Sequence, residues 1–339
     1  MTANQQTLQN RLRGIVQCFS QRKIVVVGDA IADRFLYGSI ARVSREAPVF
    51  ILRHEQTETI PGGAANCAVN LAALGARVSL ISVAGDDEAG RELRIKLEQA
   101  DVNCDGLITA SKLNTTTKVR ILAGQAHSNR QQVIRIDYED SPFVDVEARS
   151  QLTNALRKAA SDADAVIISD YNYGVVDDAA VTTLREVSAK QKIPILVDSR
   201  FRLASFKGFT SATPNEDELE QLIGKRISDL IRLEKAAQEL KDQLDYRALL
   251  ITRGGHGMML LEDGVAPLHI KAVGAESPVD VTGAGDTVIA TFTLAISCDS
   301  SFSDAARLAN YAGGLVVMKR GTASITAAEL EHSILSSGQ

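Results

Sequence analysis

Residues Lys23–Gly28 read KIVVVG, a run of β-branched side chains that ends in glycine. This pattern is typical of a buried strand in a parallel sheet. A polar outer helix is expected before it, over residues 1–20. Helix and strand patterns alternate after it: helix 64–74, strand 78–83, helix 88–99, helix 146–161, strand 165–169, helix 178–191, strand 193–197, helix 232–244, strand 248–252 and helices 284–297 and 304–319. Such alternation predicts an α/β fold with a doubly wound, mostly parallel sheet that is covered on both faces.

Two stretches interrupt this alternation, residues 35–60 and 115–138. They contain the extended runs VFILRHE, TTKVRIL and QQVIRID without a helix between them. We expect antiparallel strands of a small separate sheet, which would form a discontinuous β lid over the site. The alternative is that these runs are edge hairpins of the main sheet. The chain has no internal repeat or long linker, so we expect residues 1–339 to form a single domain with this lid.

Composition excludes several classes of function. The net charge is -5 over 339 residues, which disfavours nucleic-acid binding through a basic patch. No apolar run approaches the ~20 residues of a membrane-spanning helix, and no signal peptide is recognisable, so a cytoplasmic protein without a membrane partner is expected. The four cysteines are far apart and form no CxxC pair, which argues against a zinc site and a disulfide framework.

Residues 280–286 read DVTGAGD and lie directly before the apolar run VIATFTLAIS. A glycine-bearing turn that enters a helix offers free N–H groups and the positive end of the helix dipole to an anion. Gly283 and Gly285 let the backbone approach a phosphate closely. Asp286 falls in the first helical turn, where we expect it to stay ionised and to accept a proton from a hydroxyl group. The plainer interpretation is a glycine turn with an acidic residue after it.

This segment resembles the DTGAGD signature of the ribokinase-like (PfkB-type) carbohydrate kinases, with Val281 where many members have threonine. A second signature of that family is similar to residues 61–68 (PGGAANCA) and 70–75 (NLAALG). The resemblance covers residues 20–330 and implies an ATP-dependent phosphotransferase with an alcohol group as acceptor. It implies that Asp286 is the catalytic base and that Mg²⁺ is required, with a monovalent cation such as K⁺ as a further cofactor. The resemblance also implies that an anion cradle is formed by Gly283, Ala284 and Gly285. It implies that the sugar is contacted by Gly62, Gly63 and Asn66.

Three further segments resemble nucleotide-binding parts of that family. Residues 213–218 (TPNEDE) imply that Asn215 and Glu218 lie near the phosphates and magnesium, Glu218 acting through water, although the same pair is also a helix capping box. Residues 252–257 (TRGGHG) imply contacts with the nucleotide by Thr252, Arg253, Gly254 and Gly257. The alternative is a simple β-turn. Asn310 would lie beside the adenine, although close helix packing explains the glycines that follow it equally well.

The acceptor is indicated by a finer resemblance. Residues 42–49 (RVSREAPV) are similar to a stretch of the bacterial heptose-7-phosphate kinases, as is the run 168–171 (ISDY), although Tyr173 stands where that subfamily has lysine. Asp29 follows the first strand and is preferred over Asp33 as a sugar ligand; Asp170 is a second candidate. A sugar phosphate also needs a cationic anchor. The candidates are Lys118, Arg120, Arg130 and Arg135 in the lid, with Arg45 and Arg200, and each could equally be a solvated surface charge.

The resemblance implies phosphorylation of D-glycero-β-D-manno-heptose 7-phosphate at O1, for ADP-heptose and lipopolysaccharide core synthesis. No histidine lies in an HxGH-type motif, so no nucleotidyltransferase domain is expected. A related kinase for another sugar and a non-catalytic sugar-binding module remain as alternatives. A dinucleotide-binding GxGxxG motif and a P-loop are both absent from the sequence. The exposed lid edges predict a homodimer that pairs through the lid.

Overall fold

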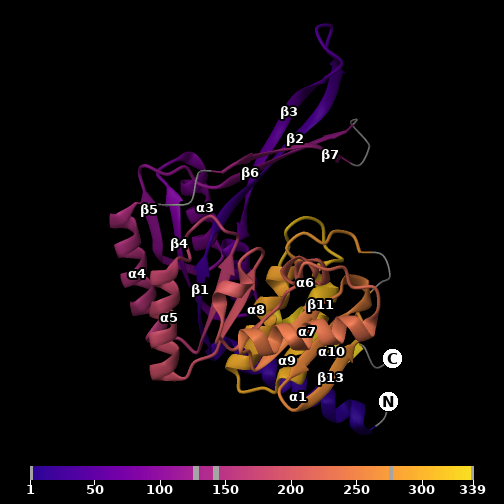
Figure 1. Ribbon diagram of the computed structural model, residues 1–339. Coiled ribbons are helices and arrows are strands. Elements are labelled where there is room, and N and C mark those ends of the chain that lie inside the picture. Colours follow the sequence, from indigo (N-terminus) through magenta and orange to yellow (C-terminus); the bar gives the residue numbers. More distant parts are fainter. Residues whose placement is uncertain (1–2, 125–129, 140–144, 275–277, 337–339) are drawn as a thin grey trace.

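The computed structural model describes residues 3–124, 130–139, 145–274 and 278–336. Its main body is an α/β layer structure, from which a small sheet projects (Figure 1). The larger sheet has nine strands in the described residues, in the spatial order β13 (Val265–Ile270), β12 (Met258–Glu262), β11 (Ala248–Thr252), β10 (Ser211–Ala212), β9 (Ile195–Ser199), β8 (Ala165–Asp170), β1 (Lys23–Gly28), β4 (Arg77–Gly85) and β5 (Val102–Ala110). The strands from β11 through β1 to β5 in this spatial order are parallel, and β12 and β13 are antiparallel additions at one edge. The predicted doubly wound, mostly parallel sheet is confirmed.

The central strand β1 contributes alternate side chains to two hydrophobic cores. Ile24 and Val26 pack on one face of the sheet and Val25 and Val27 on the other. Helices on the first face are α1 (Ala3–Cys18), α2 (Ala64–Ala73), α3 (Glu88–Gln99), α8 (Ala284–Ser297), α9 (Phe302–Val316) and α10 (Ala327–Ser336). Helices on the second face are α4 (Val146–Ala160), α5 (Asp178–Gln191), α6 (Glu216–Ile223) and α7 (Leu230–Leu244). None of the helices in these described ranges is long and apolar enough to cross a membrane.

The expected elements are present, with boundaries moved by local capping. Helix α9 begins at Phe302, earlier than expected, because the Ser301 hydroxyl accepts a hydrogen bond from the Asp304 amide. Helix α7 begins at Leu230 because Asp229 caps it in the same way. Three short 3-10 turns complete the body: η1 (Phe19–Gln21), η2 (Leu203–Phe206) and η3 (Gly254–His256).

The order of strands reverses beside β1. From β1 the chain first adds β4 and β5 on one side, and later returns to place β8 on the other. Gly28 pairs with Ser169 at the carboxyl ends of β1 and β8. Doubly wound sheets bind ligands where the strand order reverses in this way. The candidate site is built at this edge of the sheet.

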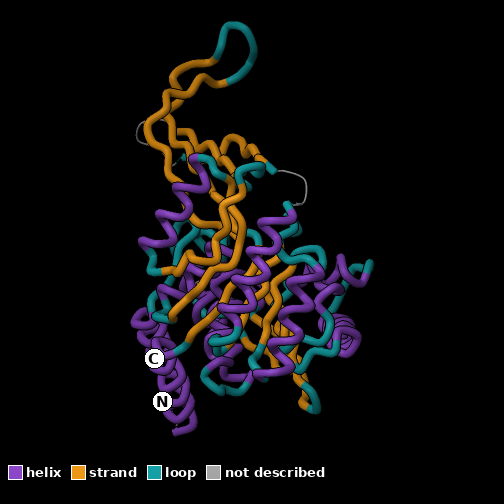
Figure 2. Tube along the Cα trace, turned by 90° about the vertical axis from the view of Figure 1, so that its left-hand side faces the viewer, coloured by secondary structure: helices purple, strands orange, loops and turns teal. Residues whose placement is uncertain are grey.

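The projecting sheet has four strands in the described residues, in the spatial order β3 (Phe50–Gly63), β2 (Ala30–Val43), β6 (Thr117–Gly124) and β7 (Gln131–Tyr138). It is separate from the main sheet, so the alternative of edge hairpins is wrong; we call it the lid, and Figure 2 shows it extending from the body as an arm. One expectation needs correction, because β2 and β6 pair in parallel, with Ala32 opposite Thr117, and not antiparallel. Both strands leave the same edge of the main sheet and therefore run in the same direction.

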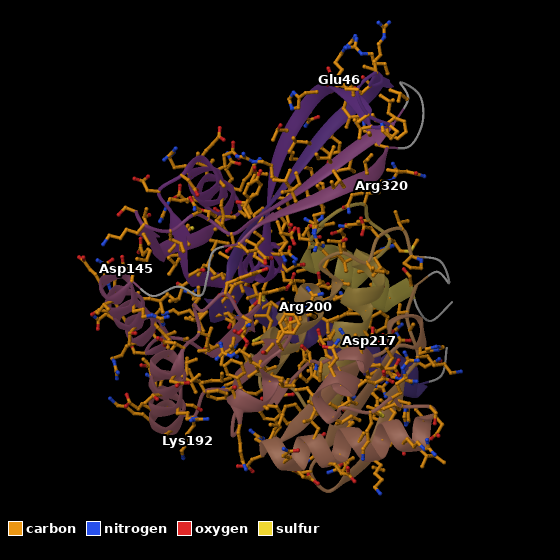
Figure 3. The ribbon with its side chains drawn as sticks, turned by 45° about the horizontal axis from the view of Figure 1, so that its top comes forward. Glu46, Asp145, Lys192, Arg200, Asp217 and Arg320 are labelled. Atoms are coloured by element: carbon orange, nitrogen blue, oxygen red, sulfur yellow. The ribbon has the colours of Figure 1, made fainter. Side chains whose placement is uncertain are left out.

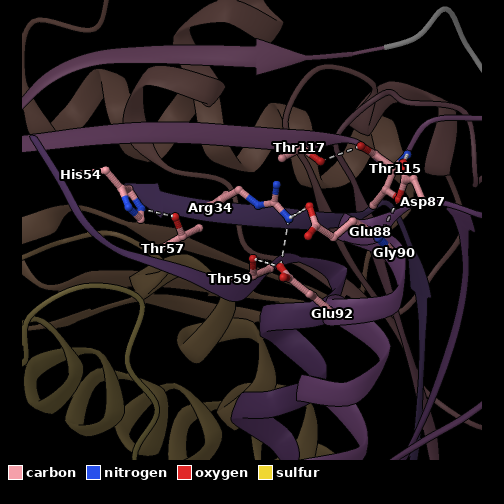
Figure 4. A network of polar contacts seen from close by, with 10 residues as sticks. All are labelled: Arg34, His54, Thr57, Thr59, Asp87, Glu88, Gly90, Glu92, Thr115 and Thr117. Atoms are coloured by element: carbon pink, nitrogen blue, oxygen red, sulfur yellow. Dashed lines mark hydrogen bonds and ion pairs between the residues drawn. The ribbon is translucent and has the colours of Figure 1, made fainter. Parts of the chain in front are cut away.

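The root of the lid is tied to α3 by polar contacts (Figure 4). Arg34 of β2 forms ion pairs with Glu88 and Glu92 of α3, and the Thr59 hydroxyl of β3 donates to Glu92. Asp87, which caps α3, accepts hydrogen bonds from the backbone and the hydroxyl group of Thr115, just before β6. One short helix therefore fixes three of the four lid strands relative to the body.

Candidate active site

Helix α8 begins at the glycine turn of the DVTGAGD segment. Gly283 is its N-cap residue and has a φ of 76°, a conformation that favours glycine. A Cβ atom on Gly283 would also lie only 2.7 Å from Nδ2 of Asn66. Backbone conformation and space therefore both require glycine here. Asp286 follows in the first turn of α8 and is 6% exposed.

Both oxygens of the Asp286 carboxylate have a hydrogen-bond donor. Nδ2 of Asn66 donates to Oδ2 at 2.6 Å, and the hydroxyl of Tyr171 donates to Oδ1 at 3.2 Å. Burial raises the pKa of Asp286 to about 6, although the two donors act in the opposite direction. The sequence predicts that Asp286 stays ionised. A pKa of about 6 still leaves most of this carboxyl ionised at neutral pH, and it makes Asp286 a stronger base than an exposed aspartate.

A buried chain of amides fixes the orientation of Asn66 on α2. Nδ2 of Asn70 donates to Oδ1 of Asn66 at 3.1 Å, and the Thr287 hydroxyl donates to Oδ1 of Asn70 at 2.7 Å. Because Oδ1 of Asn66 is an acceptor in this chain, its Nδ2 group must face Asp286. Gly62 and Gly63 precede α2, and a Cβ atom on Gly62 would lie 2.4 Å from Oδ2 of Asp33. The two glycine-rich sequence signatures meet where Asn66 contacts the carboxylate of Asp286.

A cavity of about 390 Å³ lies next to the start of α8. It brings together most of the residues that the resemblance assigns to the nucleotide, and their surroundings are mainly glycine and apolar side chains. Among the lining residues are Thr252, Gly254, Gly257, Ala284, Gly285 and Asn310. The side-chain amide of Asn310 donates to the Lys271 carbonyl at 2.8 Å, so this residue also holds the wall of the cavity.

Three predicted nucleotide residues lie outside that cavity. Asn215 and Glu218 form a capping box at the start of α6: the Glu218 amide donates to Oδ1 of Asn215 at 2.8 Å, and the Asn215 amide donates to Oε2 of Glu218 at 2.9 Å. The capping box that the spacing predicts is thus present. Nε of Arg253 donates to Glu216 at 2.7 Å, which turns its guanidinium toward α6.

Asp198 and Glu218 adjoin Asp286, and the charges of Asp286 and Glu218 affect the pKa of Asp198. Asp198 was not identified from the sequence. Burial raises the pKa of Asp198 well above its ordinary value, and the negative charges of Asp286 and Glu218 raise it further. Burial also raises the pKa of Glu218. The signal was available, because Asp198 lies at the carboxyl end of strand β9 (sequence ILVDS). Arg200, near the middle of the molecule in Figure 3, lowers the pKa of both groups.

These carboxylates suit a divalent cation, because Mg²⁺ prefers carboxylate oxygens and usually keeps water and phosphate ligands. The side chain of Asp198 forms no hydrogen bond or ion pair with the described residues, so its carboxylate oxygens are available to a ligand. Within the described part of the chain, no cluster of three or more His, Cys, Asp or Glu side chains forms a complete metal site. Asp198 and Glu218 could therefore hold a cation only together with phosphate oxygens or water.

Asp29 has a different environment from the one expected. Its side chain is buried, and its oxygens accept hydrogen bonds from the backbone amides of Tyr171 at 2.8 Å, Tyr173 at 3.1 Å and Val175 at 3.1 Å. The preference for Asp29 over Asp33 as a sugar ligand is not supported, because these amides already occupy the Asp29 carboxylate. Asp33 lies at the root of the lid and pairs with Arg120.

Four of the basic residues of the lid have a local partner, namely Lys118, Arg120, Arg130 and Arg135. Nζ of Lys118 lies 5.6 Å from the centre of the Tyr173 ring, and Nε of Arg135 is 2.8 Å from Asp137. Arg130 pairs with Glu55. Arg45 belongs to the far tip of the lid, which Figure 3 marks with the neighbouring Glu46.

Asp170 is buried below the site and accepts a hydrogen bond of 2.7 Å from the Ser199 hydroxyl.

A second cavity, of about 970 Å³, lies between the lid and the turn that carries Asp280. Its walls include Phe35, Glu58, Arg130, Asp280, Arg320 and Thr322. Arg320, which points toward the lid side in Figure 3, did not emerge from the sequence because no recognisable motif contains it.

The model of the pfkB family carbohydrate kinases matches residues 21–328. The chain belongs to this family. This pfkB-family chain is 39% identical to the bifunctional protein HldE of Photobacterium profundum, and the alignment covers 94% of this chain. It is also 39% identical to the bifunctional protein HldE of Pseudomonas aeruginosa, with 93% of this chain covered. The chain spans 65% of the length of the first of these curated relatives and 64% of the length of the second. The prediction of a sugar kinase is confirmed at the level of the family.

Solved structures agree with the fold of this pfkB-family chain. Ribokinase of Arabidopsis thaliana, complexed with ribose and ATP, superposes with a TM-score of 0.69 at 20% identity, covering 93% of this chain and 98% of that one. Phosphofructokinase-2 of Escherichia coli, in complex with potassium, superposes with a TM-score of 0.75 at 20% identity, covering 94% and 99%. At these identities the likeness establishes the ribokinase-like fold.

Proposed function

We propose that this chain transfers the γ-phosphoryl group of ATP to a hydroxyl group of a sugar phosphate, with Asp286 as the base. Asp286 accepts the hydroxyl proton, the sugar oxygen forms a bond to the γ-phosphorus, and the bond to the β-phosphate oxygen breaks to release ADP. The observation that carries the proposal is a buried carboxylate of raised pKa at the N-terminus of α8, beside the glycine turn. A base of this strength suits proton transfer near neutral pH.

The two cavities support a division of the site between the two substrates. We assign the nucleotide to the 390 Å³ cavity, where Thr252, Gly254, Gly257 and Asn310 form the walls. The backbone amides of residues 283–285 would stabilise the charge that develops on the transferred group. Mg²⁺, when bound, would neutralise the phosphates, and Asp198 and Glu218 are the residues proposed to hold it. A monovalent cation such as K⁺ is a further proposed cofactor.

The acceptor belongs between the lid and α8. Gly62, Gly63 and Asn66 lie on the body side, and Asp33, Lys118 and Arg120 at the root of the lid are the proposed polar contacts. We propose D-glycero-β-D-manno-heptose 7-phosphate as the acceptor, phosphorylated at O1 to the 1,7-bisphosphate. Two observations support it: the RVSREAPV stretch at residues 42–49, and 39% identity to proteins named HldE. The product would serve ADP-heptose and lipopolysaccharide core synthesis.

A homodimer that pairs through the lid is part of the same proposal. The lid carries a set of exposed large apolar side chains on strands β2, β3 and β7 and the turn before β3. They are Ile40, Val43, Val49, Phe50, Val133, Ile134, Ile136 and Tyr138. Among the described residues, β3 and β7 are also the two edge strands of this sheet. Apolar side chains and open edges on one small sheet favour association with a second copy.

A coupled ADP-release assay with ATP and Mg²⁺ tests this function. It compares heptose 7-phosphate with ribose, fructose and fructose 6-phosphate. Selective turnover of the heptose phosphate is expected. Turnover of another sugar would retain the kinase mechanism and discard the heptose assignment. Absence of turnover on all four would favour a non-catalytic sugar-binding module.

A further inference from the structure

Tyr171 is the first residue after strand β8, and its two hydrogen-bond donors bind two different aspartates. Its hydroxyl donates to Oδ1 of Asp286 at 3.2 Å, and its backbone amide donates to Oδ2 of Asp29 at 2.8 Å. We propose that Tyr171 is a positioning residue that orients the carboxylate of Asp286, and that Asp29 acts through it by fixing the loop 171–175. This inference rests on the proposed role of Asp286 as the base.

The loop is built to hold a buried anion. Asn172 has a φ of 67° and Gly174 a φ of 94°, so residues in the left-handed conformation alternate with Tyr171, Tyr173 and Val175. This alternation turns the three intervening amides toward one point, in the manner of a backbone anion nest. The Asp29 carboxylate occupies that point. Asp29 is buried, so the charge that fixes the loop comes from the protein itself.

The two donors to Asp286 restrict the carboxylate in complementary ways. An ionised carboxylate offers about four lone-pair positions on two oxygens. Asn66 occupies one position on Oδ2 and Tyr171 one on Oδ1. Rotation of the carboxylate would break at least one of these bonds. The remaining lone pairs are therefore held in a fixed direction for a substrate hydroxyl, which proton transfer requires.

Tyr171 also remains a donor over the working pH range. Burial raises the pKa of its phenol well above the ordinary value, and the nearby charge of Asp286 raises it further. The hydroxyl therefore stays protonated and stabilises the ionised form of Asp286, which lowers the pKa of that carboxyl. Loss of this bond has two separable consequences: a weaker constraint on orientation and a higher pKa of Asp286.

The test compares Tyr171→Phe with wild type and with Tyr246→Phe. The control removes the hydroxyl of a different tyrosine, which is buried and donates to the Phe206 carbonyl at 2.9 Å. Carbon-13 NMR titration of the aspartate carboxyl groups, with Asp286 assigned from Asp286→Asn, measures the pKa without any substrate. Tyr171→Phe should raise the pKa of Asp286 by about one unit, the effect of one hydrogen bond to a charged group. Tyr246→Phe should leave it unchanged.

Kinetics form the second arm, with the acceptor that wild type turns over. Tyr171→Phe should lower kcat about tenfold at pH 6 and less at pH 8, with KM nearly unchanged. An unaltered pKa of Asp286 together with a loss of kcat that is the same at every pH would overturn the inference and leave Tyr171 a packing residue. Absence of turnover by wild type itself would count against the proposed function only, because the NMR arm reports on the Tyr171 contact independently.

Discussion

Asn66 and Asp286 lie 220 residues apart in the sequence and are joined by a hydrogen bond of 2.6 Å between Nδ2 and Oδ2. This bond favours the ionised form of Asp286, so it opposes the effect of burial on the pKa. We expect kcat/KM of wild type to rise with pH through about 6, as Asp286 becomes ionised. Asn66→Ala should move this rise to higher pH and lower kcat by about tenfold or more. A pH–rate profile that is identical in both proteins would contradict the assignment.

Asp286→Asn should abolish most of the turnover. The amide cannot accept the hydroxyl proton, and loss of a general base costs about 10²–10⁴-fold in kcat. ATP binding should be nearly unchanged, because the nucleotide cavity is lined by other residues. Steady-state kinetics and calorimetric ATP titration measure the two quantities. Turnover within a few-fold of wild type would exclude Asp286 as the base.

The same substitution should stabilise the folded protein at neutral and alkaline pH. Burial raises the pKa of Asp286 from 3.8 to about 6, so ionisation begins to oppose folding as the pH rises above 3.8 and opposes it fully above about 6. Asparagine can keep both contacts, since its oxygen accepts from Asn66 and its amide donates to the Tyr171 hydroxyl. The gain in unfolding free energy should reach up to about 3 kcal/mol at pH 8 and disappear below about pH 4. Urea denaturation at both pH values checks this sign; a gain that persists at pH 4 would contradict it.

Gly283→Ala should damage both stability and turnover. The new Cβ would lie 2.7 Å from Nδ2 of Asn66, and the φ of 76° is unfavourable for alanine, with a cost of about 1–2 kcal/mol from the backbone alone. Displacement of Asn66 would also disturb Asp286. Gly255→Ala is the matched control. Gly255 lines the 390 Å³ cavity next to the start of α8, and a Cβ atom on it would meet nothing within 4 Å. Thermal unfolding and kcat should change only in Gly283→Ala; equal behaviour of the two variants would argue against a special requirement at residue 283.

Phe50→Glu should weaken the proposed lid dimer. Phe50 begins β3 and is 56% exposed, so in a monomer a charge there has little effect on stability. Light scattering should give a dimer mass for wild type and a monomer mass for the variant. Phe201→Glu is the control, because Phe201 is 59% exposed and lies on the body rather than on the lid. A monomer mass for wild type at working concentration would refute the dimer.

The sequence was most informative where a pattern is local. The run KIVVVG predicts strand β1 because β-branched residues that alternate between two buried faces fit a parallel sheet. The segment DVTGAGD places Asp286 in the first turn of a helix because its glycines lie directly before a long apolar run. The capping box of Asn215 and Glu218 is likewise readable from spacing alone.

Other features depend on which strands become neighbours. The parallel pairing of β2 with β6 follows from the edge at which both strands leave the main sheet, and no local pattern records that edge. Asp29 was expected to contact sugar, but the backbone amides of a loop more than a hundred residues away in the sequence occupy its oxygens. Amide directions depend on the φ and ψ angles of the assembled loop, which side-chain identities do not reveal.

The sequence by itself determined the α/β class, the family and the position of Asp286, because propensity, hydrophobic periodicity and glycine turns act over a few residues. Only the tertiary structure decided which groups surround that carboxylate. Asn66 arrives from α2 and Tyr171 from the end of β8, and their distances to Asp286 depend on the packing of helices and strands across the sheet. The pKa of about 6 is likewise a property of burial, since desolvation depends on every atom that excludes water from the site.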